Sequence, residues 1–330
     1  MDEQRVAAFY NEIGSGYDRS LYFLACDPLY QAEITRLTAG RRFRRILDLG
    51  CGTGKQTILL GPCADEVWAV DISPESLRQA EARCAQAGIR NVRFLQQSIV
   101  ALPAEDGSVD AIFSYGDVIS HVHDAYHEVF RESARVLVSG GVMAFEVDGK
   151  WELDVILHKP AERARAWATK GVGHLRVWRD IPCKTFTQPE LRGILGEVGL
   201  HVVRVRGANI FHCLLPENIL FGLPADVGPA WRFASALLQQ VDKAVGTLSG
   251  FYRQRLIADL GFWISDLGRR PEGQGFRGQS AIHNPKSKME RSGMEQVMIL
   301  VAAIGSMFVL IGLVIWLAWL SANRNSERSV

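Results

Sequence analysis

Short apolar segments alternate with segments of helical spacing over the first 150 residues. Several runs are rich in β-branched and aliphatic residues, lie beside turn signals and are predicted strands: residues 45–49, 66–71, 91–95, 109–114 and 141–147. Residues 74–87 and 127–137 are predicted helices, and a shorter one begins near residue 56. Strands alternating with helices predict an α/β fold with a parallel sheet covered on both faces. Ligands of such sheets bind beyond the carboxyl ends of the strands.

A different pattern begins near the C-terminus. Residues 297–320 carry no charge, and as a helix they would be about 36 Å long, enough to cross a hydrocarbon core of about 30 Å. We therefore predict a transmembrane helix at Val297–Leu320, a flexible basic tether at residues 269–296 and a short tail at residues 321–330. Met294 could also be the first residue of a separate small membrane protein joined to this chain, and the sequence does not decide between these alternatives.

The charged residues bear on nucleic-acid binding and on the orientation of the predicted membrane segment. The sequence has 37 Lys and Arg residues, 36 Asp and Glu residues and a net charge of +1, which is not typical of a nucleic-acid-binding protein. Basic residues gather before the predicted membrane segment, and the N-terminus has no signal-peptide pattern. These features predict a single-pass membrane protein whose large N-terminal part is cytoplasmic. The six cysteines lack zinc-site spacing, so no metal site is expected.

The candidate chemistry lies in a glycine-rich turn after the first predicted strand. Gly50, Gly52 and Gly54 follow that strand and precede a helix, so the backbone can turn tightly and a ligand can approach it. Asp71 ends the next predicted strand, where a carboxylate can accept both hydroxyls of a ribose. The spacings of a P-loop and of a dinucleotide-binding turn are both absent, which leaves a G-x-G-x-G turn preceded by Asp48.

Residues 48–54 resemble the first motif of class I S-adenosylmethionine (SAM)-dependent methyltransferases. Four further segments resemble later motifs of that family in the same order: residues 70–73, 102–110, 135–141 and 186–200. The resemblance covers about residues 10–270. It implies a doubly wound, Rossmann-like, seven-stranded and mostly parallel sheet, with SAM as cofactor and S-adenosylhomocysteine as product.

The same resemblance implies roles for individual residues. The main chain of the glycine turn would hold the methionine end of SAM, Asp48 would orient its amino group, and Asp71 would bind the ribose. Ser98 stands where the family usually has an aspartate for the adenine amino group, and a neutral hydroxyl is a weaker acceptor. The expected cofactor-binding residues are Asp48, Gly50, Cys51, Gly52, Gly54, Asp71, Ile72, Ser98, Ile99 and Tyr115.

The acceptor side is less defined by the sequence. His121 is a candidate general base in the loop after the fourth predicted strand, or it packs against the helix that follows. Asp117 binds a substrate amine or caps the same helix. Tyr10 and Tyr17 resemble residues of an N-terminal helix that covers the cofactor in related enzymes, or they pack that helix onto the sheet.

These observations predict a methyltransferase domain at residues 1–268. Its core would comprise about residues 40–147 and 186–268, with cap inserts at 151–184 and 207–260 and a seventh strand at 261–267. The favoured function is a membrane-tethered methyltransferase on the cytoplasmic face, acting on a small or lipid-like acceptor such as a quinone, isoprenoid or lipid head group. The alternatives are a methyltransferase for a soluble metabolite or a membrane protein partner, and a non-catalytic SAM-binding scaffold.

Overall fold

The computed structural model describes residues 3–152, 155–156, 159–245, 255–262 and 309. The chain divides into two compact units, residues 1–263 and 264–330, of which the first contains nearly all of the described residues. The predicted tether, membrane segment and tail lie outside the described residues, apart from Val309. Among the residues that are described, no helix combines the length and the apolar character needed to cross a bilayer.

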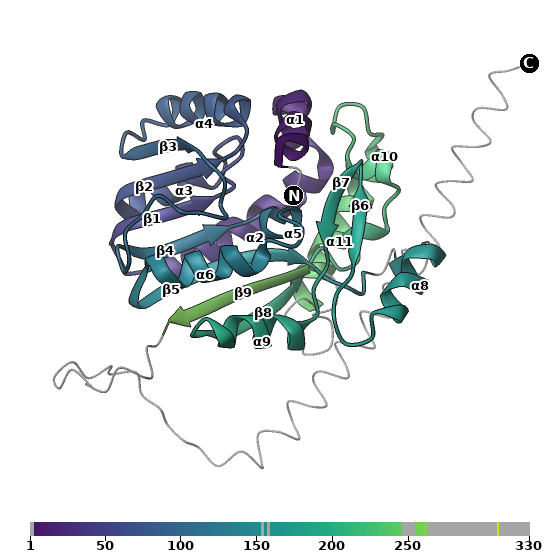
Figure 1. Ribbon diagram of the computed structural model, residues 1–330. Coiled ribbons are helices and arrows are strands. Elements are labelled where there is room, and N and C mark those ends of the chain that lie inside the picture. The colour runs from purple at the N-terminus through teal and green to yellow at the C-terminus, as the bar shows by residue number, and fades with distance from the viewer. Residues whose placement is uncertain (1–2, 153–154, 157–158, 246–254, 263–308, 310–330) are drawn as a thin grey trace, which may run out of the picture. The chain divides into compact units, whose positions relative to one another are not determined.

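A seven-stranded sheet with the order β3-β2-β1-β4-β5-β9-β8 forms the centre of the first unit (Figure 1). Neighbours from β3 to β5 pair in parallel, whereas β9 is antiparallel to both β5 and β8. The mostly parallel sheet predicted from the sequence is therefore confirmed. Its strands are β1 (Phe43–Leu49), β2 (Ala64–Asp71), β3 (Val92–Gln96), β4 (Val109–Ser114), β5 (Leu137–Asp148), β8 (Leu200–Ala208) and β9 (Arg255–Phe262).

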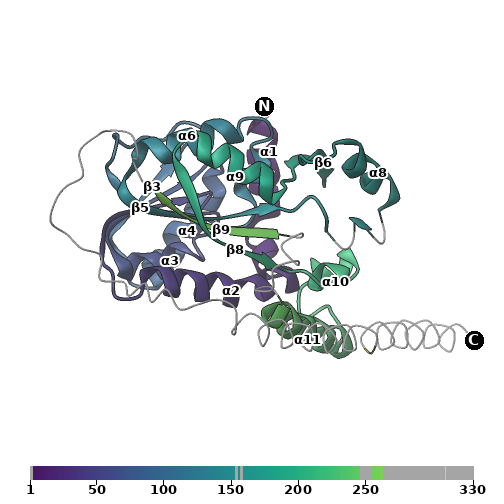
Figure 2. The same cartoon turned by 90° about the horizontal axis from the view of Figure 1, so that it is seen from below.

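Helices cover both faces of this sheet, as expected for a doubly wound fold. Figure 2 shows α6 and α9 on one face and α2 with α3 on the other. The helices of the core are α1 (Glu3–Ile13), η1 (Gly14–Arg19), α2 (Leu21–Thr38), α3 (Thr57–Leu60), η2 (Gly61–Cys63), α4 (Pro74–Gln86), α5 (Val118–His121), α6 (Tyr126–Val136) and α9 (Gln188–Glu197). Capping residues in the local sequence determine where two of these helices begin. Ser73 caps α4 by accepting a hydrogen bond from the Ser76 amide, and Thr187 with Glu190 forms a capping box at α9.

The two inserts form small elements of their own. The first contains α8 (Pro160–Ala168) and the antiparallel pair β6 (Leu175–Trp178) and β7 (Ile181–Lys184). The second contains η3 (His212–Leu214), α10 (Glu217–Leu220) and α11 (Pro229–Val245). The predicted position of the last strand, residues 261–267, is wrong. Strand β9 begins at Arg255 and ends at Phe262. Pairing with both β5 and β8 fixes this register, and the apolar run alone did not reveal it.

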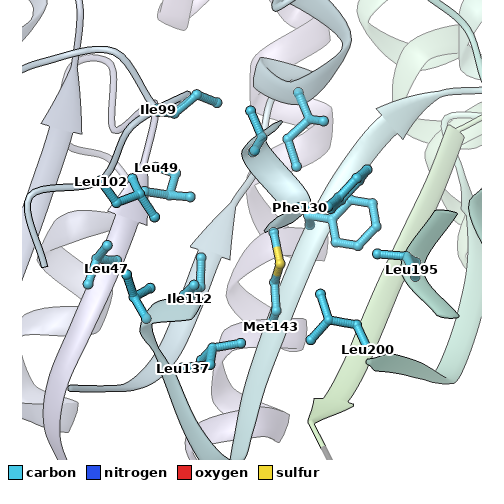
Figure 3. Packing of buried hydrophobic residues seen from close by; sticks show 14 of the residues in the cluster. Leu47, Leu49, Ile99, Leu102, Ile112, Phe130, Leu137, Met143, Leu195 and Leu200 are labelled. Carbon is cyan, nitrogen blue, oxygen red and sulfur yellow. The ribbon is translucent and has the colours of Figure 1, made fainter. Parts of the chain in front are cut away.

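Apolar side chains from the sheet and from α6 and α9 form one large buried cluster (Figure 3). Figure 3 shows Met143 of β5 among residues from β1, β4, α6, α9 and β8. The labelled members are Leu47, Leu49, Ile99, Leu102, Ile112, Phe130, Leu137, Met143, Leu195 and Leu200. This cluster fixes the positions of β1 and β4, whose carboxyl ends carry the loops described below.

On the opposite face, a buried carboxylate joins α2 to the far edge of the sheet. Glu33 of α2 is 2% exposed and accepts hydrogen bonds from Arg206 (2.9 Å) and Arg204 (2.7 Å) of β8. Burial raises the pKa of Glu33, but the hydrogen bond from Arg206 and the charge of Arg204 outweigh it, so the pKa lies below its ordinary value. The ionised form therefore stabilises the folded chain.

We expect Glu33→Ala to lower the free energy of unfolding by about 3 kcal/mol at pH 7, because it leaves the buried Arg206 guanidinium without its anion. A lowered pKa means that this stabilisation is present above the ordinary glutamate pKa and disappears as the pH falls through the lowered one. The difference between the wild type and Glu33→Gln should therefore shrink below about pH 4. Urea unfolding at several pH values measures both effects, with Asp65→Ala in an exposed ion pair as the control. Equal losses in Glu33→Ala and the control would contradict this expectation.

Candidate cofactor and acceptor site

The glycine turn after β1 requires glycine for steric reasons. Gly50 has a φ of +68°, and a Cβ added to it would lie 2.3 Å from the Cγ2 atom of Val118. Its amide donates a hydrogen bond of 2.8 Å to the carbonyl of Val70 in β2. Gly54 has a φ of +81° and packs against the backbone of Ala80 in α4. The turn therefore lies tightly between its neighbours, with its backbone open to a ligand on one side.

Asp71, at the end of β2, connects this turn to the start of α4. Its carboxylate accepts hydrogen bonds from the amides of Gly52 and Ser73, each 2.8 Å long and each to a different oxygen. Burial raises the pKa of Asp71, and the two amide hydrogen bonds oppose that rise. A carboxylate offers about four acceptor sites, so two amides leave capacity for two ribose hydroxyls.

Asp48 lies beneath the turn rather than in the cavity. It is 3% exposed, and its carboxylate accepts a hydrogen bond of 2.6 Å from the Thr57 hydroxyl. Burial raises the pKa of Asp48 to about 7, with the hydrogen bond from Thr57 opposing the shift and the charge of Asp71 adding to it. Asp48 therefore keeps its proton to a higher pH than an ordinary aspartate does, and a nearby cation would favour its ionised form.

A cavity lies beyond the carboxyl ends of β1, β2, β3 and β4, between these loops and α1. One face of α1 lines it, through Glu3, Val6, Tyr10 and Ile13, which follow helical spacing. Of the residues expected from the sequence, those that line the cavity are Gly50, Cys51, Gly52, Asp71, Ile72, Ser98, Ile99, Tyr115, His121 and Tyr10. The structure thus brings most of the expected residues to one place.

Among the described residues, Asp48, Gly54 and Asp117 do not line the cavity. Asp48 and Gly54 support the turn from behind. Asp117 occupies the N-cap position of α5 with a φ of +61° and is 6% exposed, although its side chain makes no capping hydrogen bond. Tyr17 belongs to η1, and its side chain lies outside the described residues.

Two aromatic rings lie near His121, which lines the cavity. The ring of Tyr10 lies 6.2 Å from that of His121, and the ring of Trp178 lies at the same distance. The Nδ1 atom of His121 lies 3.4 Å from the carbonyl oxygen of Pro182. Since a carbonyl only accepts, this contact favours the tautomer with the proton on Nδ1, which makes Nε2 the basic nitrogen. Burial, followed by the charge of Asp117, raises the pKa of Tyr10, so its phenol stays protonated.

Two stacked tyrosines, Tyr30 and Tyr115, and the buried Glu146 behind them form the floor of the cavity, which the sequence did not predict. Glu146 of β5 is fully buried, and its carboxylate accepts hydrogen bonds from the Tyr30 hydroxyl (2.5 Å) and the Gly116 amide (3.0 Å). The ring of Tyr30 stacks on that of Tyr115 at 4.9 Å, and both line the cavity. No local motif marks Tyr30 or Glu146, because they lie more than 100 residues apart in the sequence.

A second cluster, centred on Asp18, joins η1 to the glycine turn. Asp18 is 7% exposed and accepts hydrogen bonds from the Thr53 hydroxyl (2.7 Å) and the Arg83 guanidinium (2.8 Å). Lys55 donates a further hydrogen bond of 2.9 Å to the main-chain carbonyl of Asp18. These contacts hold the N-terminal segment against the turn and α4, and so help to close the cavity.

Comparison with known proteins supports the nature of this site. Residues 46–141, which contain the turn and Asp71, match the family model described as a methyltransferase domain. The match is to a methyltransferase domain and is confined to this segment. The cradle formed by the glycine turn and Asp71 fits the cofactor of that family, SAM.

Individual relatives show how far the likeness extends. The chain is 34% identical over 148 residues to the demethylmenaquinone methyltransferase of Lactococcus lactis, covering 43% of this chain and 57% of that one. It is 28% identical over 205 residues to the Thermus thermophilus protein of the same name, covering 58% and 91%. The chain spans about half the length of the first curated relatives it matches.

Solved structures support the fold alone. A chain in the complex of the Haloferax volcanii Trm112 methyltransferase activator with a methyltransferase matches with a TM-score of 0.52 and 18% identity, covering 77% of this chain and 97% of that one. The [4+2]-cyclase SpnF matches with the same TM-score and 17% identity, covering 79% and 96%. A methyltransferase fold can therefore carry another activity, so the residues of the site must support the function.

The raised pKa of Asp48 leads to a testable dependence of SAM binding on pH. If ionised Asp48 attracts the ammonium group of SAM, a protonated Asp48 must first lose its proton. We expect the affinity for SAM to rise by up to about tenfold between pH 5.5 and pH 7.5, as Asp48 ionises through its pKa of about 7. Isothermal titration calorimetry on the wild type and on Asp48→Asn measures this. An equally steep rise in Asp48→Asn would show that another group is responsible.

Proposed function

We propose that the chain transfers the methyl group of SAM to a small, largely apolar acceptor. The observation that carries this proposal is a single cavity that contains both the Asp71 cradle and an apolar region. The apolar lining comes from Val6, Ile13, Phe23, Val118 and Val122. The names of relatives support a small acceptor as well, since they include demethylmenaquinone methyltransferases and a malonyl-[acyl-carrier protein] O-methyltransferase. Within this class we favour a quinone-type acceptor.

The residues of the cavity have distinct parts in this proposal. Bound SAM supplies an electrophilic methyl group, to which the acceptor gives an electron pair while the methyl–sulfur bond breaks and S-adenosylhomocysteine remains. The glycine turn and Asp71 align that methyl group, and the apolar wall excludes water. His121 is the proposed base, because its Nε2 atom can take the proton that an acceptor hydroxyl or ring carbon loses. Asp117 is buried, does not line the cavity and contributes to the raised pKa of Tyr10, so we assign it to positioning rather than to proton transfer.

The membrane segment is a separate part of the proposal. Residues 297–320 are uncharged and long enough to cross a bilayer, and basic residues precede them. We propose that they tether the catalytic domain to the cytoplasmic face of a membrane. A tether raises the effective concentration of an enzyme near an acceptor dissolved in the same bilayer. A quinone with an isoprenoid tail is an acceptor of that kind.

The catalytic proposal predicts methylation of a demethylated naphthoquinol. Full-length protein should transfer labelled methyl groups from SAM to this acceptor, and Asp71→Ala should lower kcat/KM at least about a hundredfold by removing the ribose contact. Asp65→Ala changes an exposed aspartate of the same strand and should leave the rate unchanged. Label in an organic extract, lost only with Asp71→Ala, supports the proposal. Label only in proteins or water-soluble products favours the protein-partner or metabolite alternative, and SAM binding without turnover favours a scaffold.

The tether predicts a difference between two acceptors. With a long-chain naphthoquinol in vesicles, a chain ending at residue 268 should react at least about tenfold more slowly than the full chain. With a short-chain, water-soluble naphthoquinol, the two chains should react at the same rate. Equal rates on the vesicle-bound acceptor would contradict the tethering proposal and leave the catalytic one intact.

A further inference from the structure

The first turn of α1 places a carboxylate in the cavity beside the end of β3. The Ser98 hydroxyl donates a hydrogen bond of 2.5 Å to the Oε1 atom of Glu3, across 95 residues of sequence. Both residues line the cavity, together with Ile72 and Ile99. Nothing in the reaction described above uses Glu3, which raises the question of what this carboxylate binds.

The order of the strands locates the base of a bound nucleoside. The glycine turn follows β1, Asp71 ends β2, and Ser98 follows β3, and these three strands are neighbours in the sheet. A nucleoside whose 5′ substituent lies on the turn and whose ribose lies on Asp71 must therefore direct its base toward β3. Ile72 and Ile99 provide apolar surface for the faces of that base. The edge of the base then meets Ser98 and Glu3.

The Ser98 hydroxyl already makes two hydrogen bonds, so Glu3 is the better candidate to accept a hydrogen bond from the base. Its hydroxyl hydrogen goes to Glu3, and its oxygen accepts a hydrogen bond of 3.2 Å from the Val100 amide. The Glu3 carboxylate has about four acceptor sites, of which Ser98 occupies one. A carboxylate accepts hydrogen bonds more strongly than a neutral hydroxyl does. Glu3 is thus the better partner for an exocyclic amino group.

The position of α1 is fixed from its other end. The Asn11 side chain accepts hydrogen bonds from the Ser73 hydroxyl (2.7 Å) and the Glu75 amide (3.4 Å) at the start of α4. On the acceptor side, the ring of Phe9 lies 5.8 Å from that of Trp178. Figure 1 shows α1 between α4 and the β6–β7 pair. The helix therefore spans the cavity and holds Glu3 over the region that the base would occupy.

We propose that Glu3 determines adenine specificity by accepting a hydrogen bond from the adenine 6-amino group, a role that the family resemblance implies for Ser98. This inference rests on the proposed SAM-dependent function and extends it to a residue of α1. The carboxylate favours an amino group at position 6 of the purine, because the group donates hydrogen, and disfavours a carbonyl there, because two acceptors face each other.

The test compares two ligands that differ only at position 6, S-adenosylhomocysteine and S-inosylhomocysteine. Calorimetry on the full-length wild type should show tighter binding of the adenosine compound by at least about a hundredfold. Glu3→Gln keeps the size of the side chain and can accept the Ser98 hydrogen bond, but its amide can also donate to a carbonyl. We expect it to weaken binding of the adenosine compound about tenfold and to reduce the preference between the two ligands at least about tenfold.

Glu12→Gln is the matched control, because Glu12 is an exposed glutamate on the same helix and does not line the cavity. It should bind both ligands as the wild type does. An unchanged ligand preference in Glu3→Gln would overturn the proposal, even if binding of both ligands weakened together. That second pattern would mean that Glu3 only supports α1. Failure of the wild type to bind the adenosine compound would instead contradict the SAM-dependent function itself.

Discussion

The carboxylate of Asp71 holds together the two loops on which the whole site depends. One oxygen accepts the Gly52 amide from the turn after β1, and the other accepts the Ser73 amide at the start of α4. Ser73 in turn caps α4 and donates a hydrogen bond to Asn11 of α1. A single side chain therefore couples the turn, α4 and, through Ser73, the helix that spans the cavity. Because amides satisfy part of this half-buried carboxylate, it can remain in place and still accept further hydrogen bonds.

Buried polar groups fix the rest of the site in a similar way. Glu146 supports the floor through Tyr30 and Gly116, and Asp18 fastens η1 to the turn through Thr53. Each of these carboxylates joins segments that are distant in the sequence, so the cavity is enclosed by contacts between them rather than by any one segment. The surrounding surface is mostly apolar, which suits alignment of a methyl group away from water.

Local rules explain which parts the sequence could predict. The parallel strands, the cap at Ser73, the glycine turn and Asp71 follow from patterns a few residues long, and their placement is confirmed. The sequence pattern predicts the last strand at 261–267, whereas β9 spans Arg255–Phe262, because its register depends on pairing with β5 and β8 after a long insert. No pattern near Glu3 points to Ser98, since their contact depends on how α1 crosses the cavity. The predicted membrane segment lies outside the described residues and stays a prediction.

A crystal structure of the full chain with S-adenosylhomocysteine tests the central claim most directly. The account predicts both ribose hydroxyls within about 3 Å of the Asp71 carboxylate oxygens. It also predicts the homocysteine end on the backbone of Gly50 and Gly52, with the hydrogen bonds from Gly52 and Ser73 to Asp71 still present. A ribose bound elsewhere in the cavity, with Asp71 contacting only the two amides, would contradict it.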